Sequence, residues 1–159
     1  MSEIKVRTAQ PQDEDAIVET LYEAWSENGL FKPDEDLIRN QIRPFLNLDN
    51  GIIGIIKDDE IEGLVILSVS TYWYSASIFL EEYVTFVRPN YRSATGGRAR
   101  KLVEFAKRAA EKLNMPLVYG ILSSERTVAK TKLYKRHLGE PAGAIFLYGA
   151  STSDKNMVQ

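Results

Sequence analysis

The stretch at residues 86–102, FVRPNYRSATGGRARKL, constrains the fold more than any other part of the chain. It joins the end of an apolar run to the start of a helical pattern through a turn that contains Gly96 and Gly97. Because Pro89 cannot donate to a strand ladder, we expect the apolar run at residues 78–87 to be a strand that stops just before it. The order of strand, glycine turn and helix organises the rest of the chain.

The same turn has the chemistry of an anion-binding site. Glycine lets the backbone approach a ligand closely, and the first turn of a helix presents N–H groups at the positive end of its dipole. Phosphate and pyrophosphate groups bind at such places, and Arg88, Arg92 and Arg98 are near enough in sequence to pair with their oxygens. The alternative is a plain tight turn whose arginines lie on a solvated face. Neither phosphate-loop nor dinucleotide-binding glycine spacing is present.

Composition favours one domain, expected over residues 1–149, followed by a flexible tail at 150–159. The chain has 159 residues, of which 44% are hydrophobic and 26% charged, enough for a sizeable core. The formal net charge of -2 argues against nucleic acid as a partner, although the basic stretch at 88–101 keeps a nucleic-acid or protein-interaction module open as an alternative.

The absence of cysteine rules out disulfides, thiol nucleophiles and thiolate metal sites, and with a single histidine, His137, we expect no metal site. The N-terminus has no apolar signal segment, and no apolar run approaches the length needed to span a membrane. We therefore expect a cytoplasmic protein with no membrane partner.

Periodicity predicts an α+β fold with a mixed, mostly antiparallel sheet flanked by about four helices. Helices are expected from Pro11 to Asn28, from Pro33 with a stop or kink at Pro44, over residues 98–113, and from Thr127, which would cap the last of them. Strands are expected at residues 4–8, 51–57, 61–74, 78–87, 117–122 and 144–148, with the fifth joined in parallel to the fourth across a helix.

Three motifs in this order resemble the GNAT superfamily of acetyl-CoA-dependent N-acyltransferases. Residues 87–92, VRPNYR, match the end of the family's fourth strand, and residues 92–97, RSATGG, match its pyrophosphate loop. Residues 127–139 match a later helix that carries a Leu-Tyr pair, here Leu133 and Tyr134. The resemblance covers residues 4–148 in element order, and its specific part is 84–139.

The sequence departs from the family pattern at several positions. Thr95 stands where the family has its first loop glycine, which implies altered cofactor affinity, and Thr127 replaces an asparagine. One extra residue lies between Tyr134 and Gly139, and a single strand follows Pro141 where most members have two. The missing strand would leave an open sheet edge, so a homodimer formed through the C-terminal edge is a hypothesis.

The resemblance implies transfer of an acetyl group from acetyl-CoA to a primary amine, on a small molecule or a protein, by direct attack. The alternative is a regulatory or interaction protein that binds coenzyme A with little or no catalysis. The pantetheine arm would bind along the strand end and the pyrophosphate on the loop amides. The cofactor-binding residues implied in this way are Phe86, Val87, Arg88, Arg92, Ser93, Ala94, Thr95, Gly96, Gly97, Arg98 and Thr127.

Tyr134 is our choice of general acid, because a phenol with a pKa near 10 can protonate a thiolate whose conjugate acid has a pKa of about 8.5. A base must also deprotonate the amine. Glu81 and Glu82 lie on adjacent positions of the fourth strand and point to opposite faces, so one of them should face the cleft, and we slightly favour Glu81. His137 is an alternative base, although a lone histidine near a helix end is more often structural.

The acceptor site implied by the resemblance involves the link between the first two helices and the late strands. Trp25, Phe31 and Trp73 are the aromatic side chains expected to line it. For Trp25 a place in the core is the stronger alternative, because it follows the apolar spacing of its helix.

Overall fold

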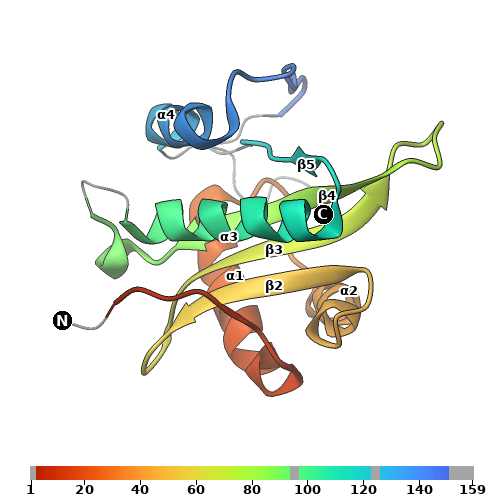
Figure 1. The fold of residues 1–159 in the computed structure, drawn as a ribbon. Helices are drawn as coiled ribbons and strands as arrows, with labels where there is room; N and C mark the ends of the chain where they lie inside the picture. The colour runs from red at the N-terminus through yellow and green to blue at the C-terminus, as the bar shows by residue number, and fades with distance from the viewer. Residues whose placement is uncertain (1–2, 94–96, 123–125, 151–159) are drawn as a thin grey trace.

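The computed structural model describes residues 3–93, 97–122 and 126–150 (Figure 1). Five strands form one sheet in the order β1-β2-β3-β4-β5, in which all neighbours are antiparallel except the parallel pair of β4 and β5. This confirms the predicted mixed, mostly antiparallel sheet. The elements are β1 (Arg7–Thr8), the 3-10 turn η1 (Pro11–Asp13), α1 (Glu14–Asn28), α2 (Glu35–Leu46), β2 (Gly51–Lys57), β3 (Ile61–Thr71), β4 (Ile78–Val87), the 3-10 turn η2 (Pro89–Tyr91), α3 (Gly97–Leu113), β5 (Leu117–Val118) and α4 (Thr127–Leu138).

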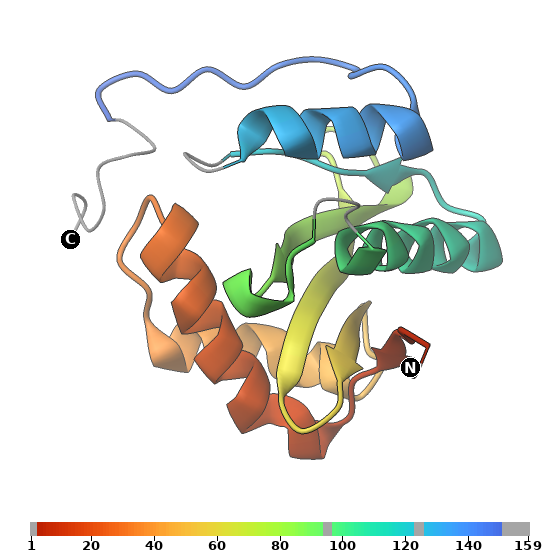
Figure 2. The same cartoon turned by 90° about the vertical axis from the view of Figure 1, so that its left-hand side faces the viewer.

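Helices cover both faces of the sheet. Figure 2 shows α1 on one side and α3 on the other, with α4 lying beyond the edge that β5 forms. On the α1 and α2 side, Ile17 and Phe45 belong to one buried cluster with Ile53 of β2. On the opposite side, Leu102 of α3 packs in a second cluster with Leu80 of β4. These apolar stripes are the reason that the helices dock where they do.

Gly54 lets α3 approach β2 closely. A Cβ atom at this position would lie 2.7 Å from a ring carbon of Phe105 and 2.9 Å from Val6. Because real Cβ atoms do not make such short contacts, any larger residue would push α3 away from the sheet. The position of α3 matters for function, since its first turn follows the glycine loop.

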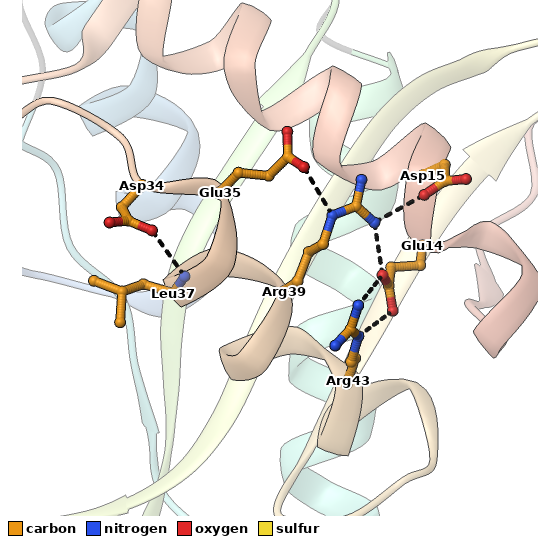
Figure 3. A network of polar contacts seen from close by, with 7 residues as sticks. All are labelled: Glu14, Asp15, Asp34, Glu35, Leu37, Arg39 and Arg43. Carbon is orange, nitrogen blue, oxygen red and sulfur yellow. Dashed lines mark hydrogen bonds and ion pairs between the residues drawn. The ribbon is translucent and has the colours of Figure 1, made fainter.

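Arginine side chains from the middle and last turn of α2 hold this helix against the start of α1 (Figure 3). The Asp34 carboxylate caps α2 by accepting the backbone N–H of Leu37 at 3.1 Å. Arg39 donates to Glu14 at 2.6 Å and to Asp15 at 2.8 Å, while Arg43 donates to Glu14 at 2.9 Å. The segment between α1 and α2, residues 29–34, is therefore held in place at the end that enters α2.

Three expectations about element ends need correction. The stop expected at Pro44 is not observed, because α2 continues to Leu46 and a proline in the last turn removes only a bond near the helix end; the alternative of a kink there stays a prediction. α4 begins at Thr127, but its N-cap is Arg126 in a left-handed conformation, so Thr127 is not the cap. The third predicted strand ends at Thr71 and not at residue 74, where the β3–β4 connection begins.

Other predicted strands are shortened or missing. The first strand is confined to Arg7–Thr8, and the fifth to Leu117–Val118. Residues 144–148 form no strand; Ile145 is 75% exposed and Phe146 92% exposed. Strand formation needs a neighbouring strand for its hydrogen bonds, and this segment passes beyond α4, away from the sheet (Figure 2). The predicted tail at 150–159 lies outside the described residues except for Ala150.

No helix in the part of the chain that the structure describes is long and apolar enough to cross a bilayer. Within the same residues, no group of three or more His, Cys, Asp or Glu side chains is arranged to hold a metal ion.

Candidate active site

A cleft of about 250 Å³ opens between the end of β4, η2, the first turn of α3 and one face of α4. These elements face the viewer in Figure 2. The cleft combines an apolar strand end with many cationic side chains, as a site for an elongated anionic ligand would. The residues that line it are Thr85, Phe86, Val87, Tyr91, Arg92, Ser93, Arg98, Ala99, Arg126, Ala129, Lys130, Lys132, Leu133, Tyr134 and Arg136.

The structure brings several of the predicted residues together in this cleft. Phe86, Val87, Arg92, Ser93 and Arg98, all predicted to bind the cofactor, share it with the predicted acid Tyr134. Gly97 is the first residue of α3 and lies at the same end of the molecule. Three further predictions, Ala94, Thr95 and Gly96, lie outside the described residues.

Arg92 and Arg98 are held in place by carboxylates and backbone carbonyls. Arg92 pairs with Glu27 at the end of α1 at 2.8 Å and donates to the Val87 carbonyl at 2.9 Å. Arg98 pairs with Glu62 of β3 at 2.7 Å. Such charge-assisted bonds fix the two guanidinium groups at the rim of the cleft, where an anion would meet them.

Two predicted residues lie outside the lining of the cleft. Arg88 donates to Thr20 at 3.0 Å and to Glu60 at 3.1 Å, and it lies 3.4 Å from Glu23, so its side chain ties β4 to α1. Thr127, at the exposed start of α4, also does not line the cleft. For both residues the role in cofactor binding stays a prediction.

The cationic face of α4 was missed by the sequence analysis. Arg126, Lys130, Leu133 and Arg136 recur at helical spacing and line one wall of the cleft. This periodicity was visible in the sequence, but a basic stripe is also typical of a solvated helix face. The pKa of Lys130 is lowered, chiefly because burial disfavours its charge.

Behind the cleft, Glu82 belongs to a buried hydrogen-bond network. Thr85 Oγ1 donates to Glu82 Oε2 at 2.8 Å and lies 2.8 Å from the Tyr119 hydroxyl. The ring of Tyr119 packs edge-to-face against that of Tyr134, with centroids 4.9 Å apart. The network therefore joins a carboxylate to Tyr119, and Tyr134, the predicted acid, packs against the ring of Tyr119.

A β-bulge in β4 makes this network possible. Ile66 of β3 lies opposite Val84, whereas the next residue, Leu67, lies opposite Glu82, so Tyr83 is an extra residue in β4. Without the bulge, the period of two along a strand would place Glu82 and Thr85 on opposite faces.

With the bulge, Glu82 and Thr85 share the face that packs against α3. Leu80 lies two positions before Glu82, and Val87 lies two positions after Thr85. Both belong to the α3-side cluster, so Glu82 and Thr85 face the same way. The pairing of β5 with β4 is confined to Leu80 and Glu81. Beyond Glu81 no described strand pairs with β4 on this side, and Thr85, Phe86 and Val87 line the cleft there.

Burial tunes the acidity of the network. It raises the pKa of Glu82 to about 7, opposed by hydrogen bonds from Thr85 and Gly120 and by the Lys130 charge. Burial and the Glu82 charge also raise the pKa values of Tyr134 and Tyr119, so both phenols stay protonated at neutral pH. The site therefore places a carboxyl that titrates near neutrality close to a protonated phenol.

Glu81, the carboxylate slightly favoured from the sequence, lies elsewhere. It accepts a hydrogen bond from Ser70 of β3 at 2.9 Å and does not line the cleft. Glu82 does not line the cleft either, but it bonds to Thr85, which does. The bulge that allows this contact is not visible in the sequence. His137 does not line the cleft either.

The three predicted acceptor residues are not gathered in one place. Trp25 packs against the α1-side core and meets Tyr22 edge-to-face at 6.0 Å between ring centroids. Phe31 is 57% exposed on the segment after α1, whose end Arg92 ties to the cleft. Trp73 is 94% exposed in the β3–β4 connection, next to the end of β4 that lies farthest from the cleft.

No family model and no curated protein sequence matches this chain. Solved structures do match it over most of their length. One is the integron cassette protein HFX_CASS3 from the mobile metagenome of Cole Harbour Salt Marsh, which is 25% identical, with a TM-score of 0.67 over 92% of this chain and 90% of that one.

Two further matches are acetyltransferases. AAC(6')-Iy, in complex with the bisubstrate analogue CoA-S-monomethyl-acetylneamine, is 17% identical, with a TM-score of 0.69 over 92% of this chain and 97% of that one. The aminoglycoside acetyltransferase meta-AAC0020, from an uncultured soil metagenomic sample and in complex with sisomicin, is 14% identical, with a TM-score of 0.65 over 91% of this chain and 94% of that one. The chain has the fold of the GNAT acetyltransferases.

Proposed function

We propose that this protein is an N-acetyltransferase that transfers the acetyl group of acetyl-CoA to a primary amine of a small molecule by direct attack. The observation that carries the proposal is the cleft itself. It runs from the start of α3 to Tyr134, and Thr85 on its wall donates to the carboxylate of Glu82 at 2.8 Å. An anion-binding end and an acid–base pair are the two requirements of this reaction.

The residues present fit coenzyme A. Among the described residues no strand pairs with β4 beyond Glu81 on the β5 side, so that edge of β4 is open to the amide groups of a pantetheine arm, apart from the Val87 carbonyl, which accepts a hydrogen bond from Arg92 at 2.9 Å. Arg92, Arg98 and the first turn of α3 would meet the phosphates. When bound, the cofactor would supply the acetyl thioester.

In this scheme Glu82 accepts one proton of the incoming ammonium group, directly or through water, and the free amine attacks the thioester carbonyl. The nitrogen then releases its second proton to solvent as the C–S bond breaks. Tyr134 then donates its proton to the departing thiolate. A base with a pKa of about 7 is matched to work near neutral pH, and a phenol kept protonated by burial is matched to donate. The assignment of roles to these two residues is part of the proposal.

The compounds bound to the structural neighbours support a small-molecule acceptor. AAC(6')-Iy was solved with an analogue that joins CoA to an acetylneamine, and meta-AAC0020 with sisomicin. Both compounds are amines, so we propose a small amine and test a protein amino group as the competing acceptor. Phe31, which is 57% exposed on the segment that follows α1, is the predicted residue that we propose contacts the amine.

Acetyl-CoA binding, measured by calorimetry, tests the cofactor half of the proposal. We expect Arg92→Ala to weaken binding by at least about tenfold, because a charge-assisted hydrogen bond to phosphate contributes roughly 1.5–3 kcal/mol. Arg100→Ala is the matched control, since Arg100 lies on α3 outside the cleft and only approaches Glu104 at 3.8 Å. If wild-type protein binds no acetyl-CoA, the proposed function is wrong.

A release assay for free thiol across a panel of amines and basic peptides tests the chemical half. Turnover with small amines and none with peptides supports the proposal. Binding of acetyl-CoA without thiol release for any acceptor would favour a regulatory protein that only binds coenzyme A.

We also propose that two copies associate through the C-terminal edge of the sheet. β5 is an edge strand, and the segment at 144–148 is exposed although it is rich in strand-forming residues, with Tyr148 fully exposed. Pairing of this segment with β5 of a second copy would cover both. Light scattering is expected to give twice the chain mass for wild type and a monomer for Phe146→Lys. A wild-type monomer at every concentration would contradict the association.

A further inference from the structure

We propose that the ion pair between Glu27 and Arg92 is a latch that a bound phosphate opens, so that cofactor binding releases the end of α1. The inference rests on the proposed function and deepens it, because it says how the cofactor site acts on the segment after α1, which carries the proposed acceptor residue Phe31. Arg92 lines the cleft, and Glu27 is the second-last residue of α1.

Glu27 occupies the donor group of Arg92 that a phosphate would need. Both carboxylate oxygens of Glu27 accept from Arg92 Nη2, at 2.8 Å and 3.0 Å. A guanidinium group has two edges that can donate a pair of N–H groups to one phosphate, one formed by Nε and Nη2 and the other by Nη1 and Nη2. Because Nη2 belongs to both edges, a phosphate that binds Arg92 through two hydrogen bonds must displace Glu27.

Arg92 does not depend on Glu27 for its position. Its Nε donates to the Val87 carbonyl at 2.9 Å, and its guanidinium carbon lies 5.5 Å from the centre of the Phe86 ring, within the range of a cation–π contact. Both contacts come from the end of β4 and leave the edge formed by Nη1 and Nη2 to a phosphate. Glu27 is therefore a competitor of the phosphate rather than a support for Arg92.

The ion pair also stabilises the last turn of α1. A carboxylate at the C-terminal end of a helix is repelled by the negative end of the helix dipole, and this turn contains no basic residue. Arg92 supplies the missing positive charge from another element. The side chains of Arg92 and Glu27 are 20% and 21% exposed, so solvent screens their attraction less than it would at the surface. When a phosphate binds Arg92, the last turn of α1 loses this stabilisation and Glu27 turns towards solvent.

The last turn of α1 is the place where the segment at 29–34 can move. The other end of this segment is fixed, because Asp34 caps α2 by accepting a backbone N–H. At the α1 end, the closing hydrogen bond runs from the Gly29 N–H to the Trp25 carbonyl at 2.8 Å. Trp25 packs against the α1-side core, so weakening of this bond moves the residues after Gly29 and leaves the core in place. Phe31, which is 57% exposed, is one of these residues.

Calorimetry with acetyl-CoA and with inorganic pyrophosphate tests the competition. We expect Glu27→Gln to lower both dissociation constants by at least about threefold, because glutamine keeps the shape of Glu27 and removes the charge that competes for Arg92. In an Arg92→Ala background, the same substitution should change neither constant by more than about twofold, since nothing is left to compete for. Glu14→Gln is the matched control and should leave both constants unchanged: Glu14 lies at the other end of α1, is 19% exposed and pairs with Arg39 and Arg43.

Amide hydrogen exchange, followed by NMR, tests the release of the helix end. In wild type, saturating pyrophosphate should speed exchange of the Gly29 amide by at least about threefold, because the last turn of α1 opens more often. In Arg92→Ala, exchange at Gly29 should already be fast without ligand and should not respond to pyrophosphate. A purely structural role for Glu27 would not connect this amide to a ligand. Thermal melting of each variant confirms that it is folded.

The latch is overturned if Glu27→Gln binds both ligands no more tightly than wild type, or if pyrophosphate binds to wild type and leaves exchange at Gly29 unchanged. Failure of the proposed function is a separate result, because wild-type protein would then release no thiol with any amine. The pyrophosphate measurements would still decide whether the latch exists, since they involve no acetyl transfer.

Discussion

Tyr134→Phe is expected to lower kcat by roughly 100- to 1,000-fold while the Kd for acetyl-CoA changes by less than about threefold, because general acid catalysis contributes on this scale and phenylalanine preserves the ring. The fall in kcat comes only from slower departure of the thiolate, because the phenol proton is missing. Tyr134 lines the cleft, and burial together with the Glu82 charge raises its pKa, so its proton is available over the whole neutral range.

Single-turnover thiol release and calorimetry on the same preparations measure the two quantities. Tyr83→Phe is the matched control, because Tyr83 is the bulge residue of the same strand and its ring packs against Phe45 of α2, 6.0 Å away between centroids. Equal kcat for Tyr134→Phe and wild type would show that another group or water protonates the thiolate.

Glu82→Gln is expected to lower activity and raise stability at the same time. Without a base, kcat at pH 8 should fall by roughly 100-fold. In wild type, kcat/KM should rise with pH through an apparent pKa near 7, the value that burial gives Glu82, and this limb should be absent in the variant. Initial rates from pH 5.5 to 9 measure both effects.

The sign of the stability change follows from proton linkage. The pKa of Glu82 is raised in the folded protein to about 7 from an ordinary value of 4.5, so the folded state holds a proton that the unfolded state releases. Stability attributable to Glu82 is therefore fully present below pH 4.5, declines as pH rises towards 7, and stays low above it. Glutamine stays neutral at every pH.

Urea unfolding should be measured for both proteins at pH 5 and at pH 8. From pH 5 to pH 8, the free energy of unfolding of Glu82→Gln should rise by about 1–3 kcal/mol relative to that of wild type. Glu81→Gln is the competing variant, since the sequence alone slightly favoured that carboxylate. If Glu81→Gln loses more activity than Glu82→Gln, the base is Glu81 and the hydrogen-bond network behind Thr85 is structural.

Local sequence signals were sufficient for the order of the elements. The strand at 78–87 and the helix from Thr127 are observed with the predicted starts, since a proline-terminated apolar run and a helical stripe are each defined by neighbouring residues. The parallel pairing of β5 with β4 across α3 was also predicted correctly. Strand length was less predictable, because the partner that lets a strand continue lies far away in the sequence.

Sequence alone determined that this chain forms a mixed sheet with an arginine-rich glycine turn at the start of a long helix and a Leu-Tyr pair further on, since spacing and residue type encode these features locally. Only the tertiary structure decided which carboxylate bonds to Thr85 at the wall of the cleft. One extra residue in β4, Tyr83, turns Thr85 onto the face of Glu82, and a bulge arises from pairing with β3 that no local pattern records.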